Sequence, residues 1–437
     1  MAARGNQNTH PPSKTRAWRE FVGKRYRELG PGLVTGAADD DPSGIATYSQ
    51  AGAQFGYGLL WTMLLTYPLM SAVQLVSAHI GRVTGQGLAR NMGQCFPGWV
   101  VTLLVGILLV ANTINIGADL AAMAAAAELV VGGGDHVFVL VFALVCVLLQ
   151  LFVPYEQYAR VLKWLTLSLF AYAAVLFLVH VDWTAALIGF VWPQNLNSSA
   201  LFMIVAVLGT TISPYLFFWQ SSQEAEEVAV DPDAKPLKQQ PQKARKHLRR
   251  MRVDTFVGMA FSNLIAIAIM LATAATLNVH GITEIETAAQ AAEALRPIGG
   301  PYAFLLFALG IIGTGLLAVP VLAGSAAFAV GEARGWRTGL EYKPRQAIRF
   351  YSIIVVATLA GVAMEWVDVN PIKALVWSAV LNGLAAVPIM GAMMVLASNS
   401  RVMGQFRERR RLLIIGWIAT AVMAAASGAM LIDFLFG

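Results

Sequence analysis

GAADDDPSGIATY, residues 36–48, places three consecutive acids and a proline inside an otherwise apolar segment. A charged residue at the centre of a bilayer costs about 3 kcal/mol on insertion scales, so such residues usually have a function. Proline inside a helix removes a backbone hydrogen bond and clashes one turn back. The stretch therefore predicts a broken helix that brings carboxylates into an apolar region.

The composition of the whole chain indicates a membrane protein. Of its 437 residues, 57% are hydrophobic and 13% are charged, and the mean hydropathy is +0.61. Soluble domains carry about 25% charged residues. We expect an all-α polytopic protein with one transmembrane domain over 29–435. Its apolar runs predict eleven spans of helical length, at 31–54, 57–81, 98–127, 136–154, 161–181, 199–222, 255–278, 300–330, 350–368, 374–398 and 412–435.

The distribution of basic residues predicts the orientation. All 31 Lys and Arg residues except Arg296 and Lys373 fall in the N-terminal segment, in even-numbered loops or within three residues of such a loop. The positive-inside rule then predicts a bacterial inner-membrane protein with a cytoplasmic N-terminus and an extracytoplasmic C-terminus. We expect residues 1–28 to be a basic cytoplasmic segment without a signal peptide.

A cytoplasmic charged loop is expected at 223–254. Its basic run KARKHLRRMR, residues 243–252, resembles a nucleic-acid patch in composition. In a loop between spans, such a run favours contact with anionic lipid, so no nucleic-acid partner is expected. Cys95 and Cys146 lie far apart in the chain, which excludes a disulfide framework built from them.

A second break is predicted in the sixth span, at GTTISPY, residues 209–215. Spans one to five (31–181) and six to ten (199–398) would form two inverted repeats, followed by one extra helix at 412–435. Interruptions at corresponding positions of inverted repeats point to a substrate site in transporters. A plain proline kink in each helix is the alternative. We favour a cation site, because one of the two breaks carries three acids.

Several segments of the chain resemble the Nramp family of divalent-metal transporters. They are GPG at 30–32, DPSGIATYSQAGAQFGYGLLW at 41–61, RVTGQGLAR at 82–90 and NSRVMG at 399–404. The resemblance covers about 30–435. It implies a LeuT-type fold with broken helices 1 and 6, and a transporter that works by alternating access. No enzyme activity and no cofactor are expected.

The resemblance also implies a set of cation ligands. Asp41 takes the Asp position of the family's DPGN motif, whereas Gly44 replaces its Asn. Ser213-Pro214-Tyr215 replaces the family's Met-Pro-His, and Thr210 takes the place of the residue whose carbonyl binds metal. The expected metal ligands are Asp41, Asp40, Thr210 and Ser213, with Gly44 and Asn382 nearby. An oxygen-only set favours magnesium or manganese over softer metals.

Proton coupling is left open by the same comparison. The family's proton route uses the histidine of helix 6 and acids of helix 3. Asp119 is retained, but Tyr215 cannot replace an imidazole near neutral pH. Both proton symport and uncoupled transport are therefore considered. Candidate gating or coupling residues are Asp119, Tyr215, Tyr48, Trp219 and Glu224. Glu224 is either part of an acidic exit or of a solvated helix end.

Two further questions concern the acids and the cargo. Successive helical residues point about 100° apart, so Asp39, Asp40 and Asp41 cannot all face one ion. We expect Asp40 to assist Asp41 or face the cytoplasmic vestibule, and Asp39 to bind backbone or cap the broken helix. Carboxylates beside aromatic rings also suit an organic cation of the guanidinium or polyamine type, which is the alternative cargo. We expect the protein to be a monomer.

Overall fold

The computed structural model describes residues 35–36, 38–153, 165–194, 197–230, 235–366 and 370–436. The regular elements in this part of the chain are helices. In chain order the α-helices are α3 Pro42–Phe55, α4 Leu60–Thr84, α5 Leu88–Met92, α6 Gly98–Val131, α7 Asp135–Phe152, α9 Phe170–Val175, α10 Trp183–Val191, α11 Ser198–Thr211, α12 Pro214–Val230, α13 Ala244–Thr276, α14 Ala288–Glu293, α15 Arg296–Gly299, α16 Ala303–Ala333, α17 Ile348–Ala363, α18 Pro371–Ser398, α19 Ser400–Met403 and α20 Arg410–Phe436.

The long helices match the predicted spans. Within the described residues, eight helical stretches are long and apolar enough to cross a membrane, with α11 and α12 counted as one. α4, α6, α13, α16, α17, α18 and α20 each overlap one expected span, and α7 overlaps the span expected at 136–154. The chain is therefore a multi-pass membrane protein.

Two expected spans are only partly described. The first is represented by α3 and the few residues before it. The fifth, expected at 161–181, contains a 3-10 helix at Leu165–Leu169 followed by α9. Residues 1–28 lie outside the described part of the chain.

Helices α12 and α13 extend into the charged segment 223–254, which is expected to connect two spans. α12 continues to Val230, and α13 begins at Ala244 and runs through the basic residues into the apolar run. Glu, Ala, Lys and Arg are strong helix formers, so the end of an apolar run does not end a helix.

Both predicted helix breaks are present. α11 ends at Thr211, Ile212 leaves helical geometry at φ −115° and ψ 58°, and α12 begins at Pro214. Likewise, Asp41 is extended at ψ 170° and Pro42 is the first residue of α3. Proline is tolerated at the first helical position, because its missing N–H has no partner there anyway.

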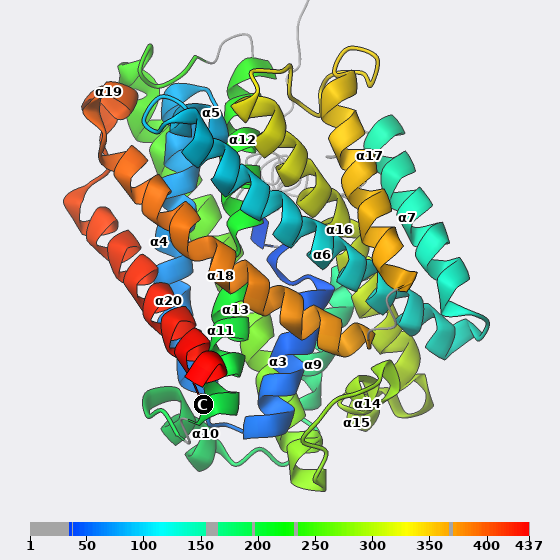
Figure 1. Ribbon diagram of the computed structural model, residues 1–437. Coiled ribbons are helices and arrows are strands. Elements are labelled where there is room, and N and C mark those ends of the chain that lie inside the picture. The colour runs from blue at the N-terminus through cyan, green and yellow to red at the C-terminus, as the bar shows by residue number, and fades with distance from the viewer. Residues whose placement is uncertain are drawn as a thin grey trace, which may run out of the picture.

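α3 lies at the centre of the bundle. It packs against α13, α18, α11 and α6, and Figure 1 shows its start next to α6 and α18, which run side by side. α20 lies at the edge against α18 and α4, whereas α7 and α17 flank α6 on the opposite edge. The acids at the start of α3 are thus surrounded by helices.

Close approach of α11 and α18 depends on glycine. A Cβ atom at Gly209 would lie 2.6 Å from the backbone nitrogen of Gly383. Small residues allow such backbone contact between membrane helices. This contact fixes the end of α11, and with it the second break.

Candidate functional site

Asp41 forms the junction between α3, α6 and α12. It is the N-cap of α3, and its Oδ1 accepts a hydrogen bond from the Gly44 N–H at 2.6 Å. Its Oδ2 accepts from Asn115 Nδ2 at 3.1 Å and from the Tyr215 hydroxyl at 3.5 Å. Only 2% of the Asp41 surface is exposed. The carboxylate therefore serves as a helix cap with one oxygen and faces two other helices with the second.

Asn115 of α6 extends this centre to two further residues. Its Nδ2 also lies 3.4 Å from Asp119 Oδ2, and its Oδ1 accepts from Asn382 Nδ2 of α18 at 3.4 Å. The structure thus brings Asp41, Tyr215, Asp119 and Asn382 together, all of them predicted site residues.

Sequence reasoning missed Asn115 itself. The available signal was its spacing, because residues 112, 115 and 119 recur at helical intervals within an apolar run and so share one face of α6.

Asp39 and Asp40 face a different helix. The Ser262 hydroxyl of α13 lies 2.6 Å from Asp39 Oδ2 and 3.0 Å from Asp40 Oδ1. Both acids are buried, with 0% and 2% of their surface exposed. Of the three acids, Asp41 rather than Asp39 caps the helix, because the chain turns from helical to extended between them.

At the break between α11 and α12, a nearby side chain hydrogen-bonds to the free backbone carbonyls. The Ser213 hydroxyl lies 2.7 Å from the carbonyl oxygen of Gly209 and 2.8 Å from that of Thr210. The last carbonyls of a helix need such partners. The Tyr215 hydroxyl, which has one proton for both acceptors, also lies 3.2 Å from the Ala38 carbonyl oxygen, so the two breaks touch each other. Ser213 and Thr210 are therefore near the site, with their oxygens engaged in closing α11.

The two aromatic candidates have separate surroundings. Tyr48 is fully buried, and its ring edge lies 3.3 Å from where a Cβ of Gly44 would be. Trp219 packs edge-on against Phe328 of α16, with ring centroids 6.1 Å apart, and also against Gly324. Its indole thus belongs to the contact between α12 and α16.

Glu224 is buried, so its interpretation as a solvated helix end is wrong. Only 3% of its surface is exposed, and its carboxylate lies 3.7 Å from the Arg82 guanidinium of α4. Arg82 also contacts Glu227 at 3.3 Å and His247 at 2.6 Å. The end of α12 is charged, as predicted, but packing of α4 and α13 around it excludes water.

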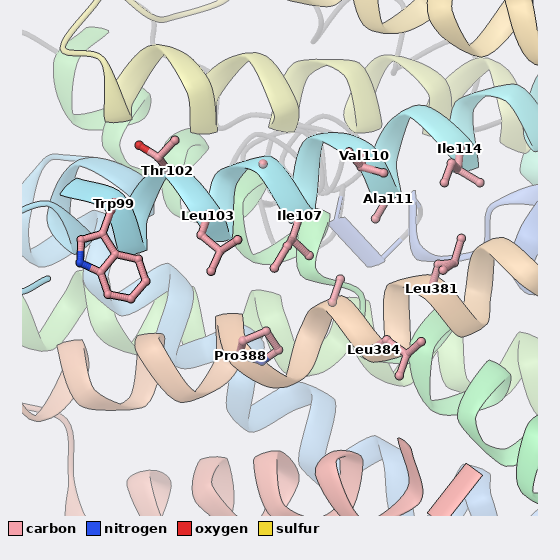
Figure 2. Close-up of a pocket in the computed structure, with 12 residues that line it drawn as sticks. Trp99, Thr102, Leu103, Ile107, Val110, Ala111, Ile114, Leu381, Leu384 and Pro388 are labelled. Atoms are coloured by element: carbon pink, nitrogen blue, oxygen red, sulfur yellow. The ribbon is translucent and has the colours of Figure 1, made fainter. Parts of the chain in front are cut away.

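One apolar surface groove is separate from this polar centre. It has a volume of about 1140 Å³ and lies between α6 and α18. Figure 2 shows apolar side chains from both helices pointing into it. Its lining residues are Trp99, Thr102, Leu103, Gly106, Ile107, Val110, Ala111, Ile114, Leu381, Leu384, Ala385 and Pro388. Without a carboxylate or amide in this lining, the groove fits apolar surroundings such as lipid.

A metal at the polar centre would need mixed ligands. Among the described residues, no group of three or more His, Cys, Asp or Glu side chains is arranged to hold a metal ion. Amide, hydroxyl or carbonyl oxygens would therefore have to join the carboxylates, as hard cations allow.

A family model and the similar proteins point to the same family. The model of Natural resistance-associated macrophage protein-like (Nramp) proteins matches residues 32–433. A protein of Klebsiella pneumoniae named "Divalent metal cation transporter MntH" is 26% identical over 420 residues, covering 94% of each chain. A protein of Deinococcus radiodurans with the same name is 24% identical, covering 94% of this chain and 90% of its own.

Solved structures share the fold. A crystal structure of a mutant manganese transporter of Eremococcus coleocola superposes with a TM-score of 0.72 at 16% identity, covering 99% of this chain and 91% of that one. Mhp1, a nucleobase-cation-symport-1 family transporter, gives a TM-score of 0.54 at 13% identity, covering 92% of each chain. These likenesses support the LeuT-type, all-helical architecture implied by the sequence.

Proposed function

The chain belongs to the Nramp family, and on that premise we propose that it carries a divalent metal cation across the membrane. The cation would bind at Asp41 and be exposed to each side in turn by alternating access. The observation that carries the proposal is the buried Asp41 carboxylate at the meeting point of two broken helices. Similar proteins named divalent metal cation transporters support the cargo class.

A hard cation, magnesium or manganese, is the proposed cargo. The side chains that hydrogen-bond to Asp41 are an amide and a phenol, which carry nitrogen and oxygen but no sulfur. Oxygen donors suit these cations, whereas thioethers select softer ones. The organic-cation alternative is not favoured, since similar proteins are named divalent metal cation transporters.

Inverted repeats and orientation complete the proposal. Pro42 and Pro214 each begin the second half of a broken helix, as expected for equivalent helices of two repeats. The basic residues favour a cytoplasmic N-terminus and an extracytoplasmic C-terminus. Labelling of Phe436→Cys by an impermeant thiol reagent from outside intact cells, in a Cys95→Ala/Cys146→Ala background, tests this orientation.

Binding calorimetry on the purified protein tests the cargo. Magnesium and manganese are expected to give heat that Asp41→Asn abolishes, because asparagine retains the capping oxygen but lacks the charge. Asp182→Asn is the matched control. Asp182 also caps a helix, α10, but it is exposed, so binding should be unchanged.

Two further binding measurements distinguish a hard-cation site from a site that uses sulfur and from an organic-cation site. Met123 lies one turn beyond Asp119 on α6 and packs against Gly315, so Met123→Leu tests whether sulfur contributes. A hard site predicts unchanged magnesium and manganese binding in that variant. Cadmium binding that depends on Met123 would overturn the hard-cation proposal. Heat from agmatine or spermidine, with silence from every metal, would favour the organic-cation alternative.

A further inference from the structure

Asn115 presents a buried amide at the acidic centre. It contacts Asp41 and Asp119 through Nδ2 and Asn382 through Oδ1. Asn112, one turn earlier, turns instead to α16, where its Nδ2 donates to the Leu322 carbonyl at 2.9 Å and to Ser325 Oγ at 2.8 Å. Two asparagines of the same helix therefore have clearly different surroundings.

Two oxygens at this centre have no partner within the described part of the chain. They are Asp119 Oδ1 and Asn382 Oδ1. The two residues are buried, with 0% and 1% of their surface exposed. Buried polar atoms in proteins are nearly always hydrogen-bonded or ligated. Both oxygens, one on each side of Asn115, are therefore free to accept a hydrogen bond or to bind a ligand.

The two broken helices offer few neutral side-chain ligands to this centre. The Ser213 hydroxyl contacts the carbonyls of Gly209 and Thr210. At Gly44, an added Cβ would lie 3.2 Å from Thr210 Oγ1, 3.3 Å from the Tyr48 ring and 3.4 Å from the Asp39 carbonyl. α3 therefore has no room for a ligating side chain at that position.

We propose that the amide oxygen of Asn115 is a direct ligand of the cation held by Asp41, an inference that rests on the proposed function. Amide and carboxylate oxygens are ordinary ligands of hard divalent cations. The amide of Asn115 turns over, so that Oδ1 faces the cation and Nδ2 faces Asn382. Asn382 turns over with it, and its Oδ1, unpaired before, accepts from Asn115.

The exchange needs no backbone movement, because the oxygen and nitrogen of an amide occupy nearly equivalent positions. Without a cation, Asn115 donates between the two carboxylates. With a cation bound, Asn115 no longer donates a hydrogen bond to the carboxylates of Asp41 and Asp119. The positive charge of the ion then stabilises them instead. The orientation of the Asn115 amide thus depends on whether a cation is bound.

The test replaces the amide oxygen by sulfur in the full-length protein. Asn115→Met should raise the ratio of cadmium to manganese affinity by at least about tenfold, because a thioether favours softer metals. A residue that only positions Asp41 would leave this ratio unchanged, whatever happened to both affinities. Calorimetry with each metal alone gives the two constants.

Loss-of-ligand variants provide the second measurement. Asn115→Leu should weaken manganese binding by about 10–100-fold, the range seen when groups around a metal are removed. Asn112→Leu, the matched control on the same helix, should leave it unchanged. Size-exclusion chromatography establishes that each variant is folded.

The outcomes separate this inference from the proposed function. If the wild type binds manganese through Asp41 but Asn115→Met leaves the ratio of cadmium to manganese affinity unchanged, the ligand assignment is overturned and the cation site stands. If the folded wild type binds no divalent metal, the proposed function fails, and the ligand assignment fails with it.

Discussion

Gly44 shows how tightly the site is packed at the level of one residue. Its N–H donates to the capping carboxylate of Asp41, and the space for a Cβ is bounded by Thr210 and Tyr48 at 3.2 and 3.3 Å. Distances this short require the neighbours to move. The absence of a side chain thus lets α3 and α11 approach each other where both helices are broken.

The variant Gly44→Ala should therefore destabilise the protein. Overpacking by one methyl group typically costs about 1–3 kcal/mol, which exceeds the gain of about 0.5–1 kcal/mol from replacing a helical glycine. Thermal unfolding in detergent measures the effect. Gly391→Ala in α18, where a Cβ would meet nothing within 4 Å, should be neutral or stabilising. Equal melting temperatures for both variants would contradict this packing.

Helix ends carry the charges that hold the elements together. Arg82 near the end of α4 lies against Glu224 and Glu227 of α12, and 6% of its side chain is exposed. A buried carboxylate deprived of its partner is strongly unfavourable. The ends of these two helices are therefore fixed by charge, whereas their middles are fixed by apolar packing.

The variant Arg82→Leu should lower the free energy of unfolding by about 3 kcal/mol, because Glu224 would be left buried without its cation. Arg296→Leu is the control. That residue pairs with Glu293 at 3.0 Å, but 70% of its side chain is exposed, so the loss should stay below about 1 kcal/mol. Melting temperatures in one detergent compare the two. The double variant Arg82→Leu/Glu224→Gln should recover part of the loss, and a further drop would refute the ion-pair account.

The positions of the helix breaks could be predicted from the sequence, whereas the side chains that contact the residues at these breaks could not. Pro42 and Pro214 signal a local effect, the loss of a backbone hydrogen bond, which depends on neighbouring residues alone. The contact between Asp41 and Asn115 spans 74 residues, and that between Asp39 and Ser262 spans 223. Such contacts depend on how whole helices cross. The spacing of polar residues marks the buried face of α6 but not the helix that it meets.

At the scale of the whole molecule, hydropathy predicted the membrane helices well, because the bilayer requires long apolar segments. Hydropathy misplaced the helix ends next to charged residues, because α12 and α13 continue as helices into the charged segment 223–254. The central position of α3 follows from its packing against α13, α18, α11 and α6. A bundle with its acids enclosed in this way suits passage of a cation through the protein and away from lipid.

Manganese uptake into liposomes that contain the purified protein tests the central claim most directly. A metal-sensitive dye trapped inside should report entry with the wild type and with Asp182→Asn. Entry should fall to the level of empty liposomes with Asp41→Asn, because the buried carboxylate is removed while its capping role is kept. Uptake by Asp41→Asn at the wild-type rate would contradict the account.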